Sequence, residues 1–139
     1  MDNWVKLRID CSPFKVFVEL RKGAKEDAET RNKGRTDAEV NRYSFDVTNG
    51  ENDRVFTVWR HSPDENLNSA VDFSWSNSGI LVRGFKGQTL IEATLTLDDE
   101  GNCKLRVGLE NLTSWQFRKR ALEPLFFPVQ GNSPATPSP

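Results

Sequence analysis

The sequence has little of the chemistry on which most catalytic and metal sites depend. It contains one histidine, His61, and two cysteines in 139 residues. A Ser-His-Asp or Cys-His system would have to use His61, which lies beside Pro63 in a polar stretch without a nucleophile motif. One histidine and two separated cysteines cannot complete a tetrahedral zinc site without carboxylates from elsewhere. We therefore expect a protein that is not an enzyme and that has no catalytic residues, metal site or cofactor.

The glycines and the acidic residues form no recognisable ligand motif either. Gly79, Gly84 and Gly87 lie between expected strands with no helix to follow, which disfavours a phosphate-binding loop. The acidic turn at 98–102, DDEGN, lacks the alternating spacing and the distal glutamate of a calcium loop. We expect a charged hairpin turn there.

The chain also lacks an excess of charge and a long hydrophobic run. Its 19 basic and 20 acidic residues leave a net charge of −1, whereas nucleic acids and anionic membranes select basic surfaces. No apolar stretch reaches transmembrane length, and the first residues alternate instead of forming a secretory signal, so we expect a cytoplasmic protein. Cys11 and Cys103 are expected to be buried free thiols, with a bridge between neighbouring strands as the alternative.

What the sequence does have is alternation of apolar and polar residues, which is clearest in residues 89–110. Asp99, Glu100 and Gly101 fit a three-residue hairpin loop whose last residue adopts the left-handed conformation that glycine favours. A slip of one residue would bury charged side chains, so the register is well specified. It predicts four apolar pairs: Leu97–Cys103, Leu95–Leu105, Ala93–Val107 and Ile91–Leu109.

Similar alternation predicts strands over 3–10, 14–20, 41–47, 54–60, 71–75 and 80–85. The loop 49–53 would pair Val47 with Val55 and keep one face apolar. Thr113 and Gln116 have the spacing of a helix capping box, so a short helix is expected from there to about Leu122, before Pro124. The predicted fold is an all-β antiparallel sandwich or partly closed barrel of about seven to nine strands, with at most one or two short helices.

Two segments interrupt this pattern. Residues 21–39 carry charges of both signs and no aromatic or branched aliphatic residue, which predicts a mobile loop or, alternatively, a short solvated helix around Lys25–Lys33. The final residues, GNSPATPSP, are typical of a linker or disordered tail. We therefore expect a single domain over 1–129 followed by a tail at 130–139.

The candidate binding residues are aromatic and basic. Trp4 and Phe17 fall on the polar faces of the first two expected strands, where they would form a contact surface unless a C-terminal segment covers them. The second group surrounds the one compact basic run in the sequence: Trp115, Arg118, Lys119 and Arg120.

These features favour a non-enzymatic β-domain that binds another protein, for instance an accessory or partner protein of a bacterial toxin or defence system. The first alternative is a carbohydrate- or small-ligand-binding module that stacks sugars on tryptophan. The second is single-stranded nucleic-acid binding through 115–120, because basic residues beside aromatic ones bind unpaired bases. The near-neutral total charge disfavours the nucleic-acid alternative.

Overall fold

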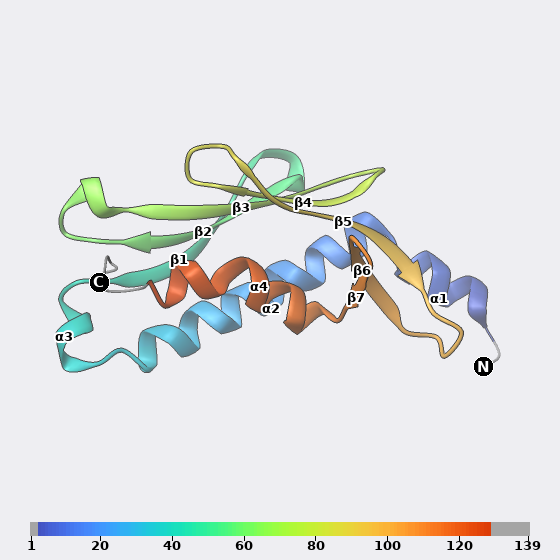
Figure 1. Cartoon of the computed structure of the whole chain (residues 1–139), viewed down its shortest axis with the longest axis horizontal. Helices are drawn as coiled ribbons and strands as arrows, with labels where there is room; N and C mark the ends of the chain where they lie inside the picture. The colour runs from blue at the N-terminus through green and yellow to red at the C-terminus, as the bar shows by residue number, and fades with distance from the viewer. Residues whose placement is uncertain (1–2, 129–139) are drawn as a thin grey trace.

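The protein is an open antiparallel sheet with two helices packed against one face (Figure 1). The computed structural model describes residues 3–128. The seven strands follow one another across the sheet in chain order, and each is antiparallel to the next. They are β1 Ser44–Asn49, β2 Val55–His61, β3 Ser69–Ser76, β4 Gly79–Gly84, β5 Thr89–Leu97, β6 Cys103–Val107 and β7 Glu110–Leu112. The two helices are α2, Pro13–Lys33, and α4, Ser114–Phe126.

The predicted all-β fold is wrong, because the first forty residues contain helices instead of strands. These are α1, Trp4–Asp10, then α2, and then the short α3, Asp37–Val40. Pro13 stands in the first turn of α2, where a missing backbone N–H costs nothing. The alternation that suggested a strand at 14–20 covers too few residues to distinguish the two periods. The buried residues continue at helical spacing: Val16, Phe17, Leu20, Gly23, Ala24, Ala28 and Arg31.

The charged segment 21–39 is consequently not a loop. Residues 21–33 form the second half of α2, so the alternative of a helix around Lys25–Lys33 was closer. Ala24 and Ala28 are 0% and 3% exposed. Their small side chains let the helix backbone approach the sheet, a contribution that a search for large apolar residues overlooks. Thr36 then begins α3 with a capping box to Glu39.

The central hairpin has the predicted register where the ladder is formed. Leu97 pairs with Cys103 and Leu95 with Leu105, and Gly101 has a φ of 85°. The predicted pairing of Leu109 is wrong, because β6 ends at Val107 and Leu109 lies, 91% exposed, in the turn to β7.

The register predicted for the β1–β2 hairpin is also wrong. Val47 pairs with Val58 instead of Val55, and Phe45 pairs with Arg60. The inner face of β2 is therefore Phe56 and Val58, both fully buried, followed by Arg60. Trp59 is on the outer face. The better burial of Phe56 and Val58 decides the register at the cost of turning a charged residue inward.

A column of four phenylalanines joins the two layers. Phe56 of β2 stacks on Phe73 of β3 with ring centroids 4.6 Å apart. Phe17 of α2 contacts Phe56 at 5.3 Å, and Phe117 of α4 contacts Phe73 at 6.2 Å. All four are fully buried. Phe17 is therefore part of the core, and the expectation that it lies on an exposed face is wrong.

The N-terminal helices are tied to the sheet by a disulfide. Cys11, between α1 and α2, is bonded to Cys103 of β6, with Cα atoms 5.4 Å apart. The expectation of two free thiols is therefore wrong, and the bridge joins a helical connection to a strand, not two strands. Disulfides persist mainly in oxidising environments, so the bridge gives no support to the expected cytoplasmic location.

One free edge of the sheet is partly covered from α2. β1 has a strand partner on one side only, among the described strands. The side-chain amide of Asn32 donates to the carbonyl oxygen of Phe45 at 2.7 Å, and its oxygen accepts from the N–H of Phe45 at 2.9 Å. The short α3 and the segment around it lie beside this edge (Figure 1).

Over residues 3–128, no helix is long and apolar enough to span a lipid bilayer. The tail expected at 130–139 lies outside the described residues.

Candidate functional site

One concave site is a groove between the outward sides of α2 and α4, of about 510 Å³. The helices run in the same direction, since Asp27 contacts Arg118 near one end and Arg31 contacts Phe126 near the other. Each helix contributes one stripe of residues, spaced by three or four positions. The α2 stripe is Asp27, Thr30, Arg31 and Gly34, and the α4 stripe is Trp115, Arg118, Lys119, Leu122, Glu123 and Phe126, followed by Phe127.

Aromatic side chains stand at the two ends of this groove. Trp115, in the first turn of α4, is 57% exposed, and Phe127, just after its last turn, is 60% exposed. Leu122 and Phe126 lie between them and are buried, so they form an apolar floor. Phe127 lies twelve positions after Trp115, which corresponds to about 18 Å at the rise of an α-helix.

The predicted capping box sets where α4 begins and therefore where Trp115 lies. The Thr113 hydroxyl accepts from the Gln116 N–H at 3.3 Å, and the Gln116 side chain accepts from the Thr113 N–H at 2.9 Å. The helix continues to Phe126 with Pro124 inside it, further than predicted. Proline removes only one helical hydrogen bond, and burial of Leu125 and Phe126 holds the last turn in place.

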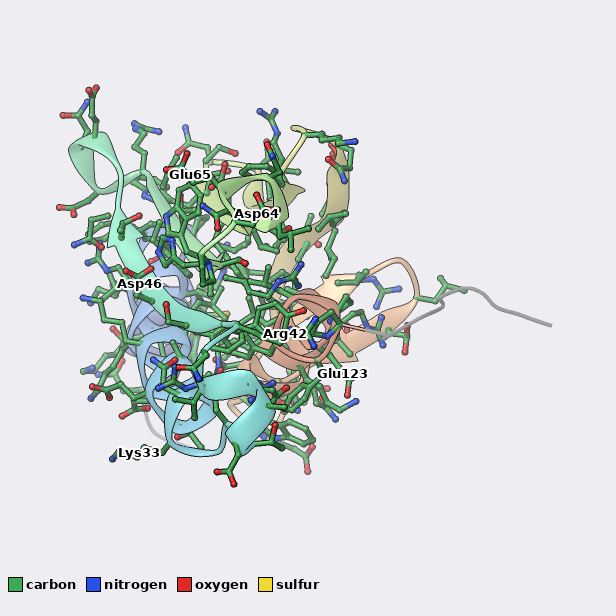
Figure 2. All side chains as sticks on the ribbon, turned by 90° about the vertical axis from the view of Figure 1, so that its left-hand side faces the viewer. Lys33, Arg42, Asp46, Asp64, Glu65 and Glu123 are labelled. Carbon is green, nitrogen blue, oxygen red and sulfur yellow. A yellow bond between two sulfur atoms is a disulfide. The ribbon has the colours of Figure 1, made fainter. Side chains whose placement is uncertain are left out.

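The cations along the groove are paired with carboxylates. Arg118 Nε donates to Asp27 Oδ2 at 2.7 Å, which links the two helices. Lys119 Nζ lies 3.2 Å from Glu123 Oε1 within α4. Figure 2 views the molecule from the end where the helices finish and shows Glu123 on α4, away from Lys33 at the end of α2. The groove is therefore apolar at its floor and close to neutral along its rim.

Arg31 closes the far end of the groove and is only 6% exposed. Its Nε donates to the Phe126 carbonyl oxygen at 2.7 Å, and its two terminal nitrogens donate to the carboxylate of Glu39 at 2.7 and 3.3 Å. The guanidinium lies 5.0 Å from the ring centroid of Phe45 and 4.6 Å from that of Phe127. Hydrogen bonds from Arg31, and a backbone hydrogen bond at Thr36, lower the pKa of Glu39 to about 2.

The structure brings together three of the six predicted binding residues. Trp115, Arg118 and Lys119 all line the groove. Arg120 lies on another side of α4, where its guanidinium binds both carboxylate oxygens of Glu110 at 2.8 and 3.1 Å. This ion pair lowers the pKa of Glu110.

The remaining two predicted residues lie elsewhere. Trp4 is 65% exposed on α1, a helix that buries none of its residues, and Phe17 is in the core. Sequence reasoning missed Phe127 and the whole α2 side of the groove. The spacing of 115, 118, 122 and 126 is a signal for one helical stripe that continues past Pro124 to the residue before Phe127. It gives no indication of the α2 side.

The single histidine, His61, is paired with an aspartate and lies outside the groove. His61 Nε2 lies 2.9 Å from Asp46 Oδ1 on the outer face of the sheet, and its ring stacks on Trp59. Both partners of the pair are about half exposed. Residues 3–128 contain no group of three or more His, Cys, Asp or Glu side chains arranged to hold a metal ion.

No protein-family model matches the chain, and no curated protein or solved structure matches it. Its function therefore has to be inferred from the groove itself.

Proposed function

We propose that the protein is a non-enzymatic interaction module and that the α2–α4 groove binds a short segment of a partner protein. The observation that carries this proposal is the pair of exposed aromatic side chains, Trp115 and Phe127, at the two ends of one apolar groove. Binding energy at protein interfaces concentrates in such aromatic anchors when they adjoin apolar pockets.

The dimensions and charge of the groove define the segment. A span of about 18 Å corresponds to about five residues of extended chain, at roughly 3.3 Å each. Because Arg118 and Lys119 already have carboxylate partners, a strongly charged segment would gain little. The segment should carry two bulky apolar side chains about five residues apart, one to pack against each aromatic anchor, with uncharged polar residues between them.

The two alternative functions fit this geometry less well. A single-strand binding surface needs free cations, but Arg118, Lys119 and Arg120 are each paired with a carboxylate. A sugar-stacking platform needs adjacent coplanar rings, whereas Trp115 and Phe127 stand at opposite ends of α4.

The experiment is selection of a displayed library of random dodecapeptides against the full chain, followed by calorimetry with one synthetic peptide of the enriched consensus. The expected consensus has two bulky apolar residues about five positions apart. Trp115→Ala should weaken binding of that peptide by about tenfold or more, as expected for a hot-spot aromatic.

Trp4→Ala is the matched control, because it removes the same side chain from a similarly exposed position on α1. Its peptide affinity should stay within about twofold of wild type. Failure of the library to enrich any peptide would contradict the proposal, and so would equal binding by Trp115→Ala. Loss of binding in Trp4→Ala alone would assign the contact surface to α1 instead.

A further inference from the structure

A second concave site lies on the other side of α4, between this helix and the inner face of the sheet. This trough has a volume of about 1100 Å³. Its walls are the C-terminal half of α4, the first residues of β3 and β5, and the turn between β4 and β5. Its apolar lining includes Val71, Ile91, Val107, Ala121 and Leu125. Leu67, Phe85 and Leu90 at its rim are about half exposed.

The trough has three cations and no carboxylate among its lining residues. The cations are Arg60, Lys86 and Arg120. Arg120 is bound to Glu110, but no carboxylate of residues 3–128 pairs with Arg60 or Lys86. Asp64 and Glu65 lie in the neighbouring turn and are not part of the lining (Figure 2).

Arg60 is unusual because it occupies an inward-facing position of β2, opposite Phe45. Its Nη1 donates to the carbonyl oxygen of Leu125 at 2.9 Å, and its guanidinium lies 5.4 Å from the Tyr43 ring centroid. Its Nε atom is buried and has no hydrogen-bond partner. Burial lowers the pKa of this guanidinium. A partly desolvated cation is costly to bury, and an anion beside the guanidinium would offset part of that cost.

From this arrangement we infer that the trough binds a small organic anion with an apolar body, such as a long-chain carboxylate or an aryl sulfonate. The anionic group is held by Arg60, with Lys86 at the rim, and the apolar body lies along Val71, Ile91 and Leu125. The volume is sufficient for a ligand of ordinary metabolite or drug size. This site is separate from the peptide groove, because the two sites have no lining residue in common.

Two fluorophores that differ by one charge test this inference. Anilinonaphthalene sulfonate carries the anion, and phenylnaphthylamine is the same apolar body without it. The full chain should bind both, and dodecanoate should displace the sulfonate more effectively than dodecanol does. Arg60→Gln should raise the Kd of the sulfonate about tenfold, the loss expected for one charge-assisted contact, and leave the Kd of phenylnaphthylamine within about twofold.

Three further variants control for folding and location. Arg60→Lys keeps the charge and should bind the sulfonate within about threefold of wild type, whereas Lys86→Gln should weaken it by about threefold, as expected for an exposed charge. Arg83→Gln removes an exposed cation from the outer face of β4 and should leave the Kd unchanged. Circular dichroism of each variant should be measured to check that it is folded.

The inference is overturned if Arg60→Gln is folded and binds the sulfonate as wild type does, or if the full chain binds neither fluorophore. It is also overturned if Trp115→Ala, and not Arg60→Gln, abolishes sulfonate binding, because the ligand would then be in the peptide groove.

Discussion

Two arginines from distant parts of the chain hold the end of α4. Arg31 of α2 donates to the carbonyl oxygen of Phe126, and Arg60 of β2 donates to that of Leu125. The last carbonyl groups of a helix have no partner within it and carry its partial negative charge, so cations are favourable there. These two side chains place the C-terminal turn of α4 between the groove and the trough.

Arg31 should be the more important of the two for stability. We expect Arg31→Met to lower the free energy of unfolding by roughly 3 kcal/mol, because it removes the cation that binds the Glu39 carboxylate and the side-chain donor to the Phe126 carbonyl. Urea denaturation measures this difference. Lys33→Met, an exposed change two residues away on the same helix, should cost less than about 0.5 kcal/mol. Similar values for the two variants would contradict the role given to Arg31.

Glu39 should make stability depend on pH in the acid range. Its pKa falls from 4.5 to about 2 on folding, so the unfolded chain binds the proton more tightly. The stabilisation is therefore fully present above about pH 4.5 and is lost as the pH falls toward 2. Wild type should be more stable than Glu39→Gln at pH 6, and most of the difference should be lost by pH 2. A difference that does not change between these pH values in urea titrations would exclude this linkage.

Among the helices, α4 is the one whose start is predicted from a local capping motif in the sequence analysis. Thr113→Ala removes the hydroxyl that accepts from the Gln116 N–H, and it should lower the free energy of unfolding by about 1 kcal/mol. Thermal unfolding followed by circular dichroism measures the loss. An unchanged midpoint would mean that the cap contributes nothing beyond the packing of α4.

The sheet could be predicted from the sequence much better than the helices. In the hairpin of β5 and β6, turn chemistry and strict alternation agree, and the register between Leu97 and Cys103 follows from both. In α2, the apolar residues are either large and closely spaced, as at 16–20, or as small as Ala24 and Ala28. Ala24 and Ala28 stabilise the packing of α2 because they let it approach the sheet closely. A search for a pattern of large apolar residues does not detect such positions.

For the same reason, only one side of the candidate site could be predicted from the sequence. The α4 side of the groove, with Trp115, Arg118 and Lys119, was found from the basic and aromatic residues near the capping box. The α2 side could not be found, because 21–39 was expected to be a loop. Arg60 was missed for a different reason. Its inward position depends on the register of the β1–β2 hairpin. Burial of Phe56 and Val58 decides that register, and it differs from the register predicted from the loop 49–53.

At the level of the whole molecule, every described strand pairs with its neighbours in sequence. The disulfide, in contrast, joins two residues that are far apart in the sequence. Cys11 and Cys103 are 92 residues apart. Closing a loop of this length restricts the unfolded chain, so replacing both cysteines with alanine should lower the free energy of unfolding by about 2–4 kcal/mol. Denaturation of wild type with and without a reducing agent should show the same loss. The double variant should be insensitive to the reducing agent, and equal stability with wild type would contradict the bridge.

The amide of Asn32 has a consequence for how copies of this protein behave at high concentration. An open sheet exposes unpaired backbone groups along its outer strands, and a strand from another molecule can add there. On β1, the two backbone groups of Phe45 are already occupied by one side chain that imitates the hydrogen bonding of a neighbouring strand. At the opposite edge, β7 has only three residues. The protein thus limits edge-to-edge aggregation in two ways. The Asn32 side chain occupies backbone groups at one edge, and the strand at the other edge is too short to pair well with a strand of another molecule.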